Sequence, residues 1–382
     1  MNFEFATATK IIFGCDTARQ VPKIASLLGK RALVLLGPKM IGANIITTEQ
    51  NWDFLQYEVV DGEPSLPILE QIVQTARKNR IDVIISVGGG SVIDMGKAVS
   101  GLAANLGEIR DYLEIVGKNH PLLEKPIPFI AIPTTAGTGA EVTRNAVIND
   151  ADKKVKVSLR SPFLYPAAAV VDPVLTFSMP AEVTAATGLD ALTQVLEPFV
   201  SVKANMMTDL FCQEGLTRIG RSLVMAYKNG NDQESREDMC WGSLLGGLAL
   251  ANSGLGVVHG FAGPIGGMFN APHGAICAAL LPYATRMNIS ALQKRMPDHP
   301  ALERYRQAGK YLLGRNVTDG SELIEGLLTL NSTLQIRPLR EWGINKTDIK
   351  DIAEKAQNAS SMKGNPIILE MNELGQILRD AW

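Results

Sequence analysis

Apolar runs and helical patterns alternate through the first half of this 382-residue chain, and this alternation restricts the possible folds more than any other feature. Short runs rich in apolar and β-branched residues predict buried strands at 31–36, 81–87, 127–132 and 168–171. Between them, the spacing of apolar residues predicts helices at 66–78 and 91–104. Strands that alternate with helices form a parallel sheet covered on both faces. We therefore expect a Rossmann-like α/β domain with a parallel sheet.

The second half of the chain has a different pattern. Strand-like runs nearly vanish, and helical spacing of apolar residues dominates. The predicted helices are 181–201, 206–228, 235–250, 300–313, 320–330, 347–358 and 372–380. We place the boundary near residue 178, so that 1–178 is a dinucleotide-binding α/β domain and 179–382 is an all-α domain.

Composition argues against several classes of protein. The formal net charge is -2 and no basic block is present, which gives no support for nucleic-acid binding. The four cysteines are widely separated and form no CxxC pair, so neither a zinc ribbon nor a disulfide framework is expected. The apolar stretch 242–268 contains a histidine and many glycines, which fits a buried helix followed by a glycine-rich turn better than a membrane span. The N-terminal residues lack the pattern of a secretory signal, and we expect a cytoplasmic protein.

A glycine loop follows the strand that ends at residue 87. It reads Gly88, Gly89 and Gly90. Ser91 is predicted to cap the next helix, with Asp94 completing an approximate capping box. Glycines allow close approach of the backbone to a ligand, and the positive end of the helix dipole favours a pyrophosphate. The alternative is a capped turn that binds nothing, and the spacing departs from G-x-G-x-x-G.

A second polar loop follows the next strand and reads PTTAGTGAEVT over 133–143. Small hydroxyl residues and glycines at the carboxyl end of a strand suit a cofactor or substrate site. Taken alone, this segment also fits an ordinary connecting loop. Two such loops at one edge of a sheet support each other as a ligand site.

The histidines and one aspartate suggest a metal centre. His259 and His273 lie in one glycine-rich segment, with His259 expected just after a helix, and a turn between them can bring both imidazoles to one point. Asp190 and Gln194 are four residues apart on a predicted helix and share a face. A carboxylate in an apolar helix is costly unless it is paired or binds a metal. Nitrogen and oxygen ligands together suit Fe(II), Zn(II) or Mn(II), while a buried salt bridge and core histidines remain the alternatives.

At these residues the chain resembles the iron-containing (group III) alcohol dehydrogenase family. The matching segments are GGGSVIDMGKA, PTTAGTGAEVTRNAV, TGLDALTQVLEPFVS and GVVHGFAGPIGGMFNAPHGAICAALLPY, together with an Asp-Pro pair at 172–173. The resemblance implies a dinucleotide-binding α/β domain followed by a helical domain. It implies that the cofactor is held by Gly88, Gly89, Gly90, Ser91, Thr134, Thr135, Thr138 and, at its ribose, Lys156. We expect Asp94 and Gly37 to lie at the cofactor as well. Asp190, His259 and His273 are implied to be catalytic metal ligands.

Three positions depart from the family pattern. The family has a histidine where this chain has Gln194, whose amide oxygen is a weaker ligand than imidazole. We expect Gln194 or water to complete the metal set. A histidine linked to proton relay is replaced by Gly263, so the alcohol proton must leave through water or the cofactor ribose. An aspartate of NAD-preferring members is replaced by Gly37, which removes repulsion against a 2′-phosphate. We therefore predict that NADP(H) is accepted.

The resemblance implies reversible hydride transfer between NAD(P)(H) and a small alcohol, aldehyde or ketone, with a divalent metal as Lewis acid. The expected metal is Fe2+, or else Zn2+ or Mn2+, and the expected partner is a small-molecule substrate, with no nucleic acid and no membrane. Family resemblance also implies a homo-oligomer, a dimer or larger. The alternatives are a metal-independent reductase of the maleylacetate reductase type, a lyase of the dehydroquinate synthase type and a non-catalytic nucleotide-binding protein.

Overall fold

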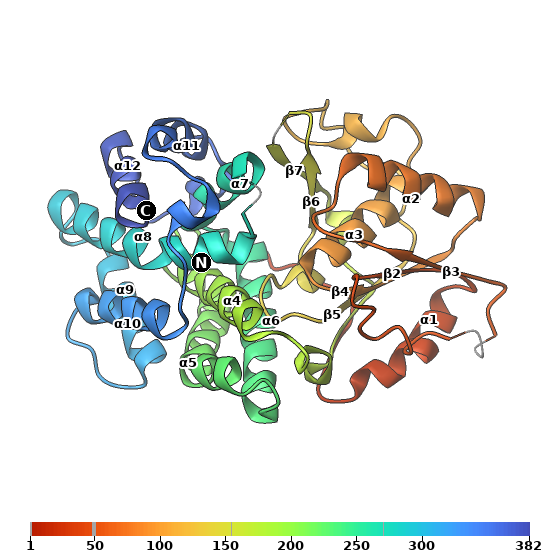
Figure 1. The fold of residues 1–382 in the computed structure, drawn as a ribbon, viewed down its shortest axis with the longest axis horizontal. Coiled ribbons are helices and arrows are strands. Elements are labelled where there is room, and N and C mark those ends of the chain that lie inside the picture. Colours follow the sequence, from red (N-terminus) through yellow and green to blue (C-terminus); the bar gives the residue numbers. More distant parts are fainter. Residues whose placement is uncertain (1, 48–50, 154, 270) are drawn as a thin grey trace. The chain divides into compact units, whose positions relative to one another are not determined.

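The structure is a computed structural model that describes residues 2–47, 51–153, 155–269 and 271–382. It divides into two compact units, an α/β unit and a helical unit (Figure 1). The α/β unit consists of Ala6–Thr135 and Gly139–Phe177. The helical unit consists mainly of Ser178–Trp382 and also takes in Ala136–Thr138. The predicted class, a parallel α/β part followed by a helical part, is confirmed.

Within the described residues, the α/β unit contains a six-stranded sheet in which every neighbouring pair is parallel. In spatial order the strands are β1 (Ile11–Phe13), β8 (Ala168–Val171), β5 (Phe129–Pro133), β4 (Val83–Gly88), β2 (Arg31–Leu36) and β3 (Phe54–Val59). The chain leaves β2 for β3 on one side and then returns to β4 on the other. This reversal creates a topological switch point between β2 and β4, where α/β sheets bind ligands at the carboxyl ends of the strands.

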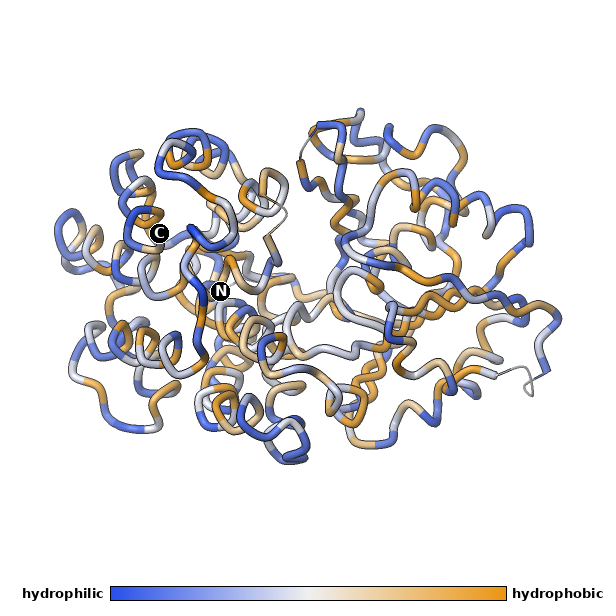
Figure 2. The backbone as a smooth tube through the Cα atoms, viewed as in Figure 1, coloured by the Kyte–Doolittle hydropathy of each residue, from blue (hydrophilic) through white to orange (hydrophobic). Residues whose placement is uncertain are grey.

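Helices cover both faces of this sheet, as the alternation of strands and helices predicted. On one face, Leu33 and Leu35 of β2 pack in one core with residues of α2 (Leu66–Lys78), α3 (Gly90–Ala104) and the antiparallel pair β6 (Asn145–Asp150) and β7 (Val155–Arg160). On the other face, Val34 and Leu36 pack with α1 (Val21–Leu28). The strands of the sheet are accordingly mostly hydrophobic in Figure 2, with polar residues concentrated in the outer turns.

The helical unit is organised around α4 (Ala181–Val200), which is buried from Gly188 to Val200 and packs against α5, α6 and α8. The other helices are α5 (Met206–Lys228), α6 (Gln233–Ser253), α7 (Val257–Phe269), α8 (His273–Arg295), α9 (Ala301–Leu313), α10 (Gly320–Thr333), α11 (Ile349–Gln357) and α12 (Met371–Asp380). No single described helix is long and apolar enough to cross a membrane. Helices α6 and α7 meet that test only together, as a pair bent by 99°.

Two local predictions were wrong. Ser91 does not cap α3, because the helix begins one residue earlier and its N-cap is Gly89, without a side-chain hydrogen bond. The segment around His259 is also not a turn, because it forms helix α7. The N–H groups at the start of α7 are bound by side chains from distant parts of the chain, which allows a helix to form in a glycine-rich sequence.

Candidate active site

Helix α4 places one carboxylate in an apolar interior. Asp190 is 1% exposed and lies between Leu189 and Ala191, which are both fully buried. Burial disfavours the charged form, but the nearby charges of His273 and His259 outweigh it and lower the pKa of Asp190. Asp190 is therefore ionised in a place where a lone carboxylate would be unstable, so its surroundings must supply positive charge.

His259 enters the same region from the first turn of α7. Glu197, two turns further along α4 than Asp190, accepts hydrogen bonds from the N–H groups of Gly256 at 2.9 Å and Val258 at 2.7 Å. Its Oε2 also lies 2.8 Å from His259 Nδ1. One buried carboxylate thus caps the helix and holds the imidazole ring. With Nδ1 donating to Glu197, Nε2 carries a lone pair directed toward Asp190, the arrangement usual for a metal-binding histidine.

His273 and Cys277 come from the first turns of α8. This helix begins at His273 and approaches α4 so closely that a Cβ on Gly274 would lie 2.6 Å from the carbonyl oxygen of Ala186. Glycine at this position therefore permits the contact that brings His273 to Asp190. Cys277 lies one turn after His273 on the same helix face, and its Sγ is 3.7 Å from His273 Nε2.

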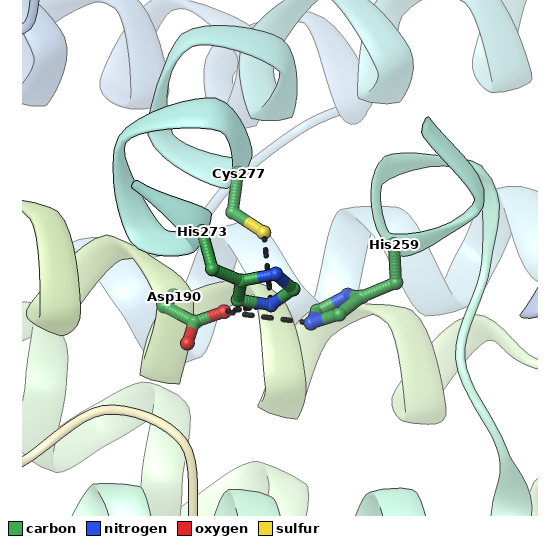
Figure 3. Close-up of side chains that lie close together, drawn as sticks. All are labelled: Asp190, His259, His273 and Cys277. Atoms are coloured by element: carbon green, nitrogen blue, oxygen red, sulfur yellow. Dashed lines mark hydrogen bonds and ion pairs between the residues drawn. The ribbon is translucent and has the colours of Figure 1, made fainter. Parts of the chain in front are cut away.

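The four side chains converge on one point, as Figure 3 shows. Oδ1 of Asp190 is 3.4 Å from His259 Nε2 and 3.6 Å from His273 Nε2. One donor atom from each of Asp190, His259, His273 and Cys277 lies within 4.8 Å of the other three. Asp190 and His259 are almost wholly buried, whereas 35% of the His273 side chain is exposed. The cluster is therefore reachable by a small molecule from the His273 side.

Several buried polar atoms of this cluster fit a metal ion. In the described part of the chain, Asp190 Oδ1, His259 Nε2 and the Oε1 of Gln194 are buried and have no hydrogen-bond partner. Buried polar atoms without partners are rare in folded proteins and call for an explanation such as an ion. Gln194 lies one turn after Asp190 and helps to lower the pKa of that carboxylate. These residues are donors that iron, zinc or manganese accept.

The protonation of His259 indicates how strongly the cluster attracts a cation. Burial opposes the charged imidazole, but the carboxylates of Asp190 and Glu197 outweigh it and raise the pKa of His259 to about 9. The two buried carboxylates therefore draw a proton onto His259 when no other cation is present. The same electrostatic attraction favours a divalent cation, which would replace that proton.

The loops predicted to bind a cofactor meet at the carboxyl ends of β2, β4 and β5. Leu36 pairs with Val87 and Gly88 pairs with Pro133, so the three strands end side by side. Cβ atoms built on Gly37 and Gly88 would lie 3.8 Å and 2.4 Å from the same methyl group of Val92. The structure thus brings together Gly37, Gly88, Gly89, Gly90, Ser91, Thr134 and Thr135. The N-terminus of α3 presents N–H groups at this edge, which suits a pyrophosphate.

Three other predicted cofactor residues have contacts or a unit of their own. The carboxylate of Asp94 accepts hydrogen bonds from Lys97 Nζ at 3.2 Å and from the N–H of Val147 at 3.0 Å, instead of capping α3. Lys156 lies on β7 and forms an ion pair of 3.0 Å with Glu63. Thr138 belongs to the helical unit, through the segment Ala136–Thr138. Contact of these residues with a cofactor stays a prediction.

Sequence reasoning missed Glu197 and Cys277. Glu197 stands seven residues after Asp190, two helical turns along the same face of a buried helix, and this spacing was a signal for a second carboxylate in the centre. Cys277 stands four residues after His273, again on one helix face. Its surroundings in the sequence, AICAAL, are apolar and read as ordinary core.

Comparison with known proteins agrees with this architecture. Residues 8–173 match the family described as iron-containing alcohol dehydrogenase, and residues 184–382 match the C-terminal part of the Fe-containing alcohol dehydrogenase family. Alcohol dehydrogenase 4 of Saccharomyces cerevisiae is 33% identical over 362 residues, which cover 92% of this chain and 91% of the yeast protein. A crystal structure of a 1,3-propanediol oxidoreductase superposes with a TM-score of 0.90 at 30% identity and covers 100% of both chains. Sulfoacetaldehyde reductase from Bifidobacterium kashiwanohense, solved in complex with NAD+, superposes with a TM-score of 0.86 at 26% identity and covers 100% of this chain and 99% of that one. The predicted family is confirmed, and the chain belongs to the iron-containing alcohol dehydrogenases, which are oxidoreductases.

Proposed function

We propose that this chain is a metal-dependent oxidoreductase that transfers hydride between NAD(P)(H) and a small alcohol or aldehyde. The observation that carries the proposal is the buried cluster in which Asp190 Oδ1 and His259 Nε2 face each other without a hydrogen-bond partner among the described residues. Such a pair is stable when a cation lies between the two atoms. Family membership and the NAD+ complex of the reductase relative support the same reaction class.

Asp190, His259 and His273 are the residues that would hold the metal, with Gln194 and Cys277 as candidates for a further ligand. A divalent cation bound there supplies Lewis acidity toward an alcohol or carbonyl oxygen. Glu197 keeps His259 in the tautomer whose Nε2 binds a metal. The partial exposure of His273 leaves one side of the centre open for the substrate oxygen.

The carboxyl ends of β2, β4 and β5 are the proposed cofactor site. The N-terminus of α3, beside Gly88 and Gly89, would bind the pyrophosphate. Gly37 offers no carboxylate to repel a 2′-phosphate, and the only charged residue in the segment 37–47 is the exposed Lys39. We therefore propose that NADP(H) is accepted at this site.

The route of the alcohol proton follows from Gly263. This residue stands one turn after His259 on α7, and a Cβ built on it would meet no atom within 4 Å among the described residues. An imidazole is absent from this position, and the space beside it is open. We propose that the proton leaves through water or the cofactor ribose.

The test combines metal analysis with a substrate panel. Purified protein, stripped of metal and then reloaded with Fe(II), Zn(II) or Mn(II), is assayed over small alcohols and aldehydes with NAD(H) and NADP(H). We expect turnover only after reloading, with about one metal ion per chain. Asp190→Ala should lose both metal and turnover, while His120→Ala, which changes an exposed histidine of the α/β unit, should keep both. Full turnover of metal-free protein would contradict the proposal and favour a metal-independent reductase.

A further inference from the structure

The sulfur of Cys277 lies inside the metal cluster and not beside it. Sγ is 3.7 Å from His273 Nε2, and it lies within 4.8 Å of the facing donor atoms of Asp190 and His259. Cys277 itself is fully buried. Its thiol thus points toward the two unpartnered atoms, Asp190 Oδ1 and His259 Nε2, that mark the position of the cation (Figure 3).

From this geometry we infer that Cys277 binds the metal as a thiolate, making the centre an Asp-His-His-Cys site. The inference rests on the proposed metal dependence and identifies one more ligand of the same centre. On binding, the S–H bond of Cys277 breaks, its proton passes to solvent, and the sulfur donates an electron pair to the cation.

The distances between the donor atoms match this assignment. Nitrogen, oxygen and sulfur atoms held about 2.0–2.3 Å from one cation at tetrahedral angles are separated by about 3.3–3.6 Å. The observed separations are 3.4 Å from Asp190 to His259, 3.6 Å from Asp190 to His273 and 3.7 Å from His273 to Cys277. Three of the six separations thus lie close to the expected range and the other three lie within 4.8 Å, so one cation can bind all four side chains once they close in on it.

Gln194 is a weaker candidate than Cys277 for the fourth ligand of the metal. Cys277 supplies one of the four donor atoms that lie within 4.8 Å of one another. The Oε1 of Gln194 is buried and without a partner in the described part of the chain, but a neutral amide oxygen is a weaker donor than a thiolate toward zinc or cobalt. The thiolate also adds a second negative charge to that of Asp190. Cys277 should therefore shift the preference of the centre toward zinc and cobalt, relative to manganese.

The deciding experiment is X-ray absorption at the zinc edge of the full chain loaded with one equivalent of zinc. We expect one sulfur scatterer at about 2.3 Å together with nitrogen and oxygen scatterers at about 2.0 Å. The wild-type spectrum decides the question without any variant. A shell of nitrogen and oxygen alone, in protein that holds one zinc per chain, would overturn the inference and leave the proposed metal dependence standing. Failure to bind zinc, iron or manganese would overturn both.

Variants identify which cysteine is responsible. Cys277→Ser should lose the sulfur scatterer, while Gln194→Ala and Cys212→Ser should keep it, the latter because Cys212 is a buried cysteine on α5 outside the cluster. With cobalt, the thiolate-to-metal charge-transfer absorption should vanish in Cys277→Ser alone. The ratio of the zinc to the manganese dissociation constant should rise at least about tenfold in that variant, since loss of an outer partner already costs about 10–100-fold. A sulfur scatterer that persists in Cys277→Ser would contradict the assignment.

Discussion

We expect a single side chain at Gly37 to change the choice of cofactor. Gly37 follows β2 at the switch point, and among the described residues a Cβ built on it meets only a methyl group of Val92, at 3.8 Å. An aspartate therefore fits there and would place a negative charge at the end of β2. We predict that Gly37→Asp lowers kcat/KM with NADPH about tenfold or more, roughly 1.4 kcal/mol, while kcat/KM with NADH is maintained. Gly37→Ala is the control for volume, and equal losses with both cofactors would contradict the assignment.

Glu197 is a positioning residue, because it binds His259 and not the reacting atoms. Its carboxylate accepts three hydrogen bonds, two of them from the start of α7. We predict that Glu197→Gln raises the metal dissociation constant about 10–100-fold. The amide keeps the volume of the carboxylate, but its own N–H groups would face the N–H groups from which the carboxylate accepts hydrogen bonds. Titration calorimetry with zinc measures the change. Glu182→Gln, at an exposed position of the same helix, is the matched control, and equal metal affinity in both variants would refute the role.

Glu141 makes the stability of the α/β unit depend on pH. It is 2% exposed. This burial raises the pKa of Glu141 from 4.5 to about 7, although its own backbone hydrogen bond and the charge of Lys97 act in the opposite direction. The folded protein therefore binds the proton more tightly than the unfolded chain. The stabilisation that this proton provides is complete below pH 4.5 and is lost as the pH rises through about 7. The total change is on the order of 3 kcal/mol.

The corresponding prediction is that Glu141→Gln removes this part of the pH dependence. Free energies of unfolding measured in urea between pH 4.5 and 8 should fall more steeply for the wild type than for the variant, and the two slopes should agree above pH 7. Parallel curves over the whole range would show that Glu141 is already ionised at pH 5.

A site residue could be predicted from the sequence when its polarity differed from that of its neighbours along the chain. Asp190 and the two histidines stand out as rare polar groups in apolar or glycine-rich segments, and the sequence alone singled them out. Cys277 is itself apolar in character and lies in an apolar stretch, so only its position in three dimensions marks it. The hydrogen bonds of Glu197 to α7 span about 60 residues, a distance at which local patterns carry no information.

At the scale of the elements, glycine is required at position 96, where α3 packs on the sheet, and is dispensable at position 263 of α7. A Cβ on Gly96 would lie 2.1 Å from Ser86 Oγ and 2.5 Å from Phe129 Cε2, whereas one on Gly263 would meet nothing within 4 Å among the described residues. We predict that Gly96→Ala destabilises the protein by about 1–3 kcal/mol. Gly263→Ala, its matched control, should stabilise by about 0.5–1 kcal/mol through lower chain entropy. Urea midpoints at constant m-value test both, and a stable Gly96→Ala variant would contradict the packing argument.

The contrast in polarity between a segment and its neighbours also explains which strands could be predicted. Strands β2 and β8 lie where predicted, and β4 and β5 begin two residues later and end one residue later, because central strands buried on both faces consist almost entirely of apolar residues. The strands that escaped prediction are the edge strands β1 and β3 and the pair β6 and β7. The partly exposed edge strand β3 reads FLQYEV, and β6 alternates buried and half-buried residues. Neither contains the apolar run on which the prediction depended.

At the scale of the whole molecule, we expect the proposed metal centre and the proposed cofactor site to stabilise different units. The proposed metal ligands come from α4, α7 and α8, while the glycine loop follows strand β4 of the sheet. A ligand present at 100 times its dissociation constant stabilises the segments that bind it by about 2.7 kcal/mol. Removal of metal should therefore act on the helical unit, and addition of NADP(H) should act on the α/β unit.

Amide hydrogen exchange of the full chain tests this separation. We predict that chelation accelerates exchange by up to about 100-fold at the starts of α7 and α8 and around Asp190, and leaves β2 and β4 unchanged. Addition of NADPH should instead slow exchange at the N-terminus of α3 and in the loop after β5. His259→Ala is the control, because chelation should then have no effect on either unit. Equal acceleration across both units on chelation would mean that the metal stabilises the fold as a whole, and the assignment of its ligands to the helical unit alone would fail.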